Sequence, residues 1–278
     1  MLVLWLGFMG WLIRYEVYPE RFTSRLDGYR GLWSEDTLLA DSWMRIEQQG
    51  VPLGYSHAHM DLNEDDPVQH HRLTVNMHLN FSGLGLEQDL VVEVSAGLDM
   101  MQELQRFAFR LNMQEQRLHM TGQRREGDQF AVTLRAGTGL QEMMVEIPSD
   151  AIVYSPMTDL AVRNMRPGQT LTLRTWNPLT QSTESIELRG LREETVELDG
   201  RRYDTVVVEA GMAALGAATR SWVHAEEGVI RQEAPLGWTL EKCTPEEAFD
   251  TLREARALAG QADGARGGWP ALPGLSLF

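Results

Sequence analysis

The sequence predicts a mostly β protein, in which an antiparallel meander forms a curled half-barrel or sandwich with one C-terminal amphipathic helix and an N-terminal apolar segment. Apolar and polar residues alternate with a period of two through most of the 278 residues. Tight-turn sequences separate the alternating runs, and no helical crossover is predicted between them, although residues 154–160 are predicted to form one short helix or turn. Because parallel strands need long crossovers, usually helical, a parallel sheet is disfavoured.

The chain begins with an apolar run, Leu2–Ile13, which contains three aromatic residues and is followed at once by Arg14. A helix of this length covers about 18 Å, short of the roughly 30 Å of hydrocarbon in a bilayer. Aromatic residues and arginine are nevertheless typical of a membrane interface, and no small-residue cleavage site follows. We predict an uncleaved membrane anchor over residues 1–18 and a linker over 19–40. The alternative is a helix packed on the domain's own core.

The antiparallel β-domain, including its C-terminal helix, is predicted to span residues 41–259. Its first hairpin turns at Gln49-Gly50-Val51-Pro52 and returns over 53–62. A dense turn signal at 63–67 precedes a strictly alternating strand at 71–81. Further strands are predicted at residues 86–95, 103–112, 116–123, 129–135, 141–147, 170–176, 184–189, 193–198, 203–209, 219–225, 229–233 and 239–243.

One helix is signalled near the end of the chain. Thr244 is the expected N-cap, Pro245 occupies the first helical position, Glu247 completes a capping box, and Gly260 is the expected stop. Its apolar stripe is expected to pack over the sheet. The stripe contains Phe249, Leu252, Ala255 and Ala259. Beyond it, residues 260–278 are rich in Gly, Ala and Pro and are predicted to be a disordered tail.

Charge and composition exclude several functional classes. The net charge is −15, which repels phosphate backbones and disfavours nucleic acid as a partner. Lys242 is the only lysine and Cys243 the only cysteine, so Schiff-base chemistry, internal disulfides and cysteine-based metal clusters are disfavoured. No catalytic or nucleotide-binding motif is present. The sequence therefore predicts no enzymatic activity and no cofactor.

The only concentration of candidate metal ligands lies between residues 57 and 78. His57, His59 and Asp61 should project from one face of their strand, because side chains two apart point the same way. His78 should lie on the same face of the next strand. Imidazole and carboxylate groups bind divalent transition metals. The alternative is a solvated polar face with a cross-strand pair between Asp61 and Arg72.

The run Gly50-Val51-Pro52-Leu53-Gly54-Tyr55 resembles a G-x-P-[IVL]-G-Y hairpin of uncharacterised bacterial envelope β-meander domains, some of which precede transglutaminase-like domains. The segments 96–99, 165–168, 176–178 and 222–224 match that pattern in outline. The resemblance covers residues 40–250 and implies a fold similar to lipoprotein-carrier half-barrels and an exported, tethered protein. It carries over no catalytic residue, because the hydrolase domain is absent.

These observations lead to one principal hypothesis, a non-enzymatic envelope protein that is membrane-anchored with a periplasmic body. Its β-domain would scaffold a protein partner or bind an apolar ligand. One alternative is a metal-binding module or metal-dependent enzyme centred on His57, His59, Asp61 and His78. Another is an accessory subunit of a membrane complex, whose N-terminal segment packs against partner helices.

Overall fold

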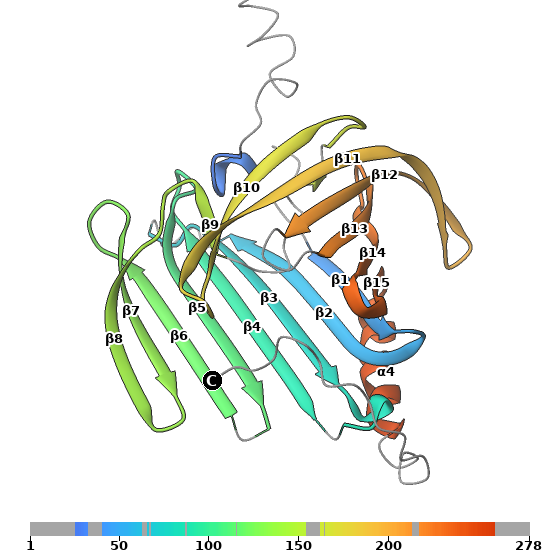
Figure 1. Ribbon diagram of the computed structural model, residues 1–278, viewed down its shortest axis with the longest axis horizontal. Coiled ribbons are helices and arrows are strands. Elements are labelled where there is room, and N and C mark those ends of the chain that lie inside the picture. Colours follow the sequence, from blue (N-terminus) through green and yellow to red (C-terminus); the bar gives the residue numbers. More distant parts are fainter. Residues whose placement is uncertain are drawn as a thin grey trace, which may run out of the picture.

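The fold is a single open sheet with one C-terminal helix, which confirms the predicted mostly β, curled architecture (Figure 1). The sheet has 15 strands in the order β8-β7-β6-β5-β4-β3-β2-β1-β15-β14-β13-β12-β11-β10-β9. The predicted anchor over 1–18, the short helix or turn over 154–160 and the tail over 260–278 lie outside the described residues. The computed structural model describes residues 26–32, 41–62, 66, 68–86, 88–114, 116–153, 162–163, 165–212 and 217–258.

The first half of the sheet contains β1 (Asp41–Gln48), β2 (Val51–Leu62), β3 (His71–Asn80), β4 (Asp89–Leu98), β5 (Leu104–Met113), β6 (Gln116–Arg124), β7 (Gln129–Ala136) and β8 (Gly139–Glu146). The second half contains β9 (Ala151–Val153), β10 (Thr170–Asn177), β11 (Ser182–Leu198), β12 (Arg201–Met212), β13 (Ala217–His224), β14 (Gly228–Ala234) and β15 (Trp238–Lys242). Pairing between β1 and β15 joins the two halves. The helical elements are η2 (Arg30–Leu32), η4 (Ser82–Leu84), η5 (Pro235–Gly237) and α4 (Pro245–Ala257).

Two features of the sheet differ from the sequence prediction. The strands predicted at 184–189 and 193–198 form one continuous strand, β11, whose alternation is interrupted by an irregularity between Gly190 and Arg192. A Cβ at Gly190 would lie 2.1 Å from the Arg166 carbonyl oxygen, so glycine permits this close approach. The short strand β9 was not predicted, and it pairs in parallel with β10. Three residues are too few to show a period of two.

The core lies between the two halves of the curled sheet. Phe107 of β5 contacts Trp176 of β10 with their ring centroids 5.1 Å apart, and both side chains are buried. Tyr29 and Leu32, within the predicted linker, are also buried in this core. The Tyr29 hydroxyl accepts a hydrogen bond from the Val153 amide. Two cavities lined partly by inward-facing residues measure about 10 Å³ each, room for at most one water molecule.

Helix α4 covers the outer face of the sheet, which is the face opposite to the core. Its predicted N-terminus is confirmed, since the Thr244 side chain accepts from the Glu247 amide and the Glu247 carboxylate accepts from the Thr244 amide. Ala248 and Leu252 pack against Tyr55 of β2. The helix ends at Ala257, and Gly260 lies beyond the described residues. Within the described part of the chain, no helix is long and apolar enough to span a membrane.

The glycines of the first hairpin have backbone roles. Gln49 and Gly50 form the β1–β2 turn with φ angles of 52° and 79°. Gly54 follows an irregularity in β1–β2 pairing and has a φ of 149°. A Cβ at Gly54 would lie 1.9 Å from the His78 carbonyl oxygen. The predicted hairpin is confirmed, and its glycine spacing is explained by turn and strand geometry rather than by a binding site.

We expect Gly54→Ala to lower the free energy of unfolding by about 2–4 kcal/mol, because the added methyl group must displace the β3 backbone. Gly211→Ala is the matched control, since its Cβ would meet no atom closer than 4.0 Å. The control should change stability by less than about 1 kcal/mol. Urea denaturation monitored by tryptophan fluorescence measures the free energy of unfolding of both variants. Equal stability of the two variants would contradict the close approach of β2 and β3.

Candidate functional site

The residues of the predicted metal site share the outer face. His57, His59 and Asp61 alternate along β2, and Tyr55, on the same face, is opposite His78 of β3. This common face is confirmed by the strand register. Asp61 is also opposite Arg72, as predicted, but the Asp61 carboxylate lies near His59, with 3.4 Å between Oδ2 and Nε2.

The imidazoles of this site stack rather than converge. The ring centroids of His57 and Trp43 are 3.8 Å apart, and the two ring planes are nearly parallel, with an angle of 12° between them. The His59 ring stacks on the His57 ring with a centroid distance of 4.7 Å. His78 stacks on Tyr55. Because imidazole lone pairs lie in the ring plane, parallel rings do not direct their nitrogens to one point. Among the described residues, no group of three or more His, Cys, Asp or Glu side chains is placed to hold a metal ion. Metal binding at this hairpin stays a prediction.

The two other reactive side chains singled out in the sequence lie near the start of α4. Burial, followed by the nearby charge of Glu247, raises the pKa of Cys243 to about 11. Its thiol is therefore protonated at neutral pH and is a poor nucleophile. The Lys242 ammonium donates to the Glu227 carboxylate and to the Glu227 carbonyl. The Lys242 side chain is therefore engaged by Glu227 and does not point into an open site.

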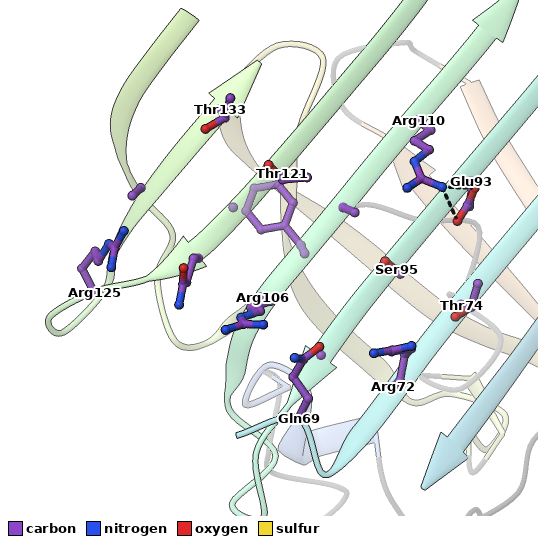
Figure 2. A pocket seen from close by; sticks show the side chains of 16 residues that line it. Gln69, Arg72, Thr74, Glu93, Ser95, Arg106, Arg110, Thr121, Arg125 and Thr133 are labelled. Atoms are coloured by element: carbon purple, nitrogen blue, oxygen red, sulfur yellow. Dashed lines mark hydrogen bonds and ion pairs between the residues drawn. The ribbon is translucent and has the colours of Figure 1, made fainter. Parts of the chain in front are cut away.

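A hollow of about 640 Å³ lies on the outer face of β3–β7 (Figure 2). This volume falls within the range of ligand-binding sites in proteins. Its side chains come from five neighbouring strands and the loops next to them. The lining residues are Gln69, Arg72, Thr74, Glu93, Ser95, Gly97, Arg106, Phe107, Ala108, Arg110, Thr121, Gly122, Gln123, Arg125, Ala131 and Thr133.

Strand register builds this hollow from a line of short side chains. We call this line the floor, and it crosses β3 to β7 through directly paired residues: Thr74, Ser95, Ala108, Thr121 and Thr133. Longer side chains, two positions away on the same strands, lie on either side of the floor. Arg72 and Arg106 flank one side, and Glu93 and Arg110 flank the other (Figure 2). The hollow exists because short residues are aligned between rows of long ones.

The hollow is cationic in a protein whose net charge is −15. Four arginines and one glutamate line it, and Glu93 is paired with Arg110 at 3.1 Å. The other three, Arg72, Arg106 and Arg125, form what we call the arginine wall. Their guanidinium groups make no ion pair or hydrogen bond within the part of the chain that the structure describes. Three guanidinium groups without an ion pair on one face favour anions.

The positive charge extends along the row that contains Arg110. His119 is opposite Arg110 on β6, and Arg135 is opposite His119 on β7. Burial, followed by the charges of Arg110 and Arg135, lowers the pKa of His119. Burial is the larger cause, and the two arginines add to it, so that the neutral form of the imidazole is favoured.

Sequence reasoning did not identify this hollow. The four arginines occupy two strands and the turn after a third, and only the register brings them together. One signal was present in Arg106-Phe107-Ala108-Phe109-Arg110, where the two arginines and the alanine share a face and both phenylalanines face the core. That pattern marks a small residue between two cations, but it does not reveal the neighbouring floor residues.

The chain was compared with family models, curated proteins and solved structures. No family model and no curated protein matches the chain. A beta-barrel-like protein of the domain of unknown function DUF1849 from Brucella abortus aligns with a TM-score of 0.47 and 5% identity, over 74% of this chain and 96% of that one. A DUF1089 family protein from Pseudomonas aeruginosa aligns with a TM-score of 0.32 and 11% identity, over 73% and 94% of the two chains.

The outer face is expected to make stability depend on pH through His78. Burial, followed by the charge of Arg256, lowers the pKa of His78. The unfolded chain therefore binds a proton more readily, with a pKa of about 6.5, and protonation favours unfolding. The contribution of this imidazole to stability is fully present above the pKa that His78 has in the unfolded chain. It is lost as the pH falls through the lower pKa that His78 has in the folded chain.

We expect the free energy of unfolding to decrease between about pH 7.5 and about pH 5, and to decrease less in His78→Gln, which cannot titrate. Asn76→Gln on the same strand is the matched control. Urea titrations at each pH give the free energy of unfolding, and its slope against pH is compared between the variants. The same slope in His78→Gln and in the control would show that His78 is not the titrating group.

Proposed function

We propose that this protein is a non-enzymatic, membrane-tethered binding domain of the bacterial cell envelope, which recognises a polar partner through the hollow on β3–β7. The arginine wall is the single observation that carries this proposal. Unpaired guanidinium groups arranged on a sheet are positioned for ligand contact, because the paired strands fix where each side chain begins.

A surface partner is favoured over an apolar ligand in the sheet interior. The inner face is occupied by core side chains, including Phe107, Phe130 and Trp176. The cavities there that are described are too small for a ligand. The apolar-ligand form of the hypothesis therefore receives no support from the described interior, while the outer hollow has room for a partner.

A binding role fits the chemistry of the described residues better than catalysis. The Cys243 thiol is held protonated, and the Lys242 ammonium is engaged by Glu227. The hollow contains arginines, hydroxyl groups and amides, which bind and orient ligands. Arginine does not lose its proton in proteins and is therefore not a general base.

The envelope location and the tether rest on the sequence. Leu2–Ile13 has the apolar and aromatic content of a membrane-interacting segment, and Arg14 follows it directly. The Gly50–Tyr55 hairpin resembles exported β-meander domains, some of which precede a transglutaminase-like domain. Such a protein would hold its β-domain near the membrane surface, where the hollow could meet partners of the envelope.

The proposal is tested by photo-crosslinking in the cells that encode the chain. The photoreactive residue p-benzoylphenylalanine replaces Thr121 in the floor or, as a control, the exposed Glu193 of β11. We expect an adduct in the membrane fraction from position 121, and about tenfold less adduct when Arg72→Gln and Arg106→Gln are added. Equal yields from positions 121 and 193, or no adduct, would contradict binding at the hollow.

The tether is tested in the same cells by deleting residues 1–18. We expect the full chain to sediment with membranes and the truncated chain to appear in the soluble fraction, because the apolar segment supplies the attachment. The Thr121 photoreactive version of each chain reports whether the hollow still binds. Membrane sedimentation of a folded truncated chain would contradict the tether and leave the binding result to stand by itself.

A further inference from the structure

The chemistry of the hollow specifies the ligand more closely than the proposed function on which this inference rests. We propose that the hollow binds an acidic oligosaccharide, with the arginine wall contacting carboxylate or phosphate groups and the floor contacting sugar hydroxyls. Two properties of the site lead to this ligand class, the spacing of the cations and the free hydroxyl groups. The lack of exposed aromatic faces disfavours a nucleic acid.

The arginine wall is too long for one small anion. Arg72 lies on β3, Arg106 on β5 and Arg125 next to the end of β6. Neighbouring strands are about 4.8 Å apart, so this row extends over about 14 Å at the backbone. Three cations whose backbones are spread over that length favour a ligand with two or more anionic groups on an extended chain over a single carboxylate or phosphate.

The floor supplies groups that match a sugar. The hydroxyls of Thr74, Ser95, Thr121 and Thr133 make no hydrogen bond within the described residues. Each hydroxyl can both donate and accept, as sugar hydroxyls do. The Gln123 amide adds a donor and an acceptor beside the arginines. Ala108, whose side chain is a single methyl group, keeps the middle of the floor low, so that a ring can approach the hydroxyl groups.

A single-stranded nucleic acid fits the same site less well. Proteins that bind such strands stack bases on exposed aromatic side chains. Phe107 is the aromatic residue of the hollow, and its ring is buried against Gly122 and Trp176. The net charge of −15 also repels a long polyphosphate chain, whereas a short acidic saccharide meets mainly the local charge of the wall.

The experiment measures binding of defined probes to the full chain purified in detergent, by isothermal titration calorimetry. Trigalacturonic acid is the acidic oligosaccharide probe, glucose 6-phosphate tests a single sugar with one anionic group, and maltotriose is the neutral probe. Inorganic phosphate and a ten-residue oligothymidylate test the anion alone and a nucleic acid. The variants are Arg72→Gln with Arg106→Gln, and Thr121→Val. The control double variant, Arg202→Gln with Arg220→Gln, removes two charges from the other half of the sheet.

We expect trigalacturonic acid to bind most tightly and to weaken with added salt. Its affinity should fall at least about tenfold in the Arg72 and Arg106 double variant and remain unchanged in the control. Thr121→Val should weaken trigalacturonic acid but not inorganic phosphate. Urea denaturation of each variant establishes that the arginine and threonine substitutions leave the fold intact.

Four outcomes would overturn the inference: no binding of either acidic saccharide, equal binding of maltotriose, tighter binding of oligothymidylate, or phosphate binding as tight as that of the saccharides. These outcomes are distinguishable from failure of the proposed function. If the Thr121 photo-adduct forms and depends on Arg72 and Arg106 while no saccharide binds, the hollow has a partner of another class. If neither signal appears, the hollow is not a binding site.

Discussion

The alternation of side chains along one continuous antiparallel ladder is the constraint on which the rest of the structure depends. In β5, Phe107 and Phe109 face the core while Arg106 and Arg110 face outward. A shift of one residue would exchange these two sets. It would bury two guanidinium groups without partners, which is strongly unfavourable in an apolar environment. The packing of the apolar core therefore fixes the strand register, and the register fixes the positions of the outward-facing arginines on the strands.

This coupling explains how a packed domain can carry a binding surface on its other side. The halves of the sheet curl around a shared core, which fills the inner face. On the outer face, α4 covers β1 to β3 through Ala248 and Leu252, and β3 to β7 are left with the hollow. The fold thus separates the region that stabilises it from the region that we propose binds a ligand.

Much of the fold could be predicted from local sequence, because strand alternation, turn glycines and a helix N-cap are local signals. The capping box at Thr244 and Glu247 and the turn at Gly50 are examples. The continuous strand β11 was misread, since a bulge at Gly190 has the same local appearance as a turn. The hollow could not be predicted, because Thr74 and Thr133 are 59 positions apart and become aligned only through four successive pairings. Conversely, His57 and His59 were correctly placed on one face, but spacing could not show that their rings stack.

A cross-strand disulfide tests the register most directly. In a Cys243→Ser background, Ser95→Cys with Ala108→Cys places two thiols on directly paired residues, whose Cα atoms should lie about 4.5–5.5 Å apart. Ser95→Cys with Thr133→Cys places them three strands apart, about 14 Å. Under mild oxidation we expect an internal disulfide in the first pair and none in the second, as measured by mass spectrometry. No bridge in the first pair, or equal bridging in both, would contradict the aligned floor and the hollow built on it.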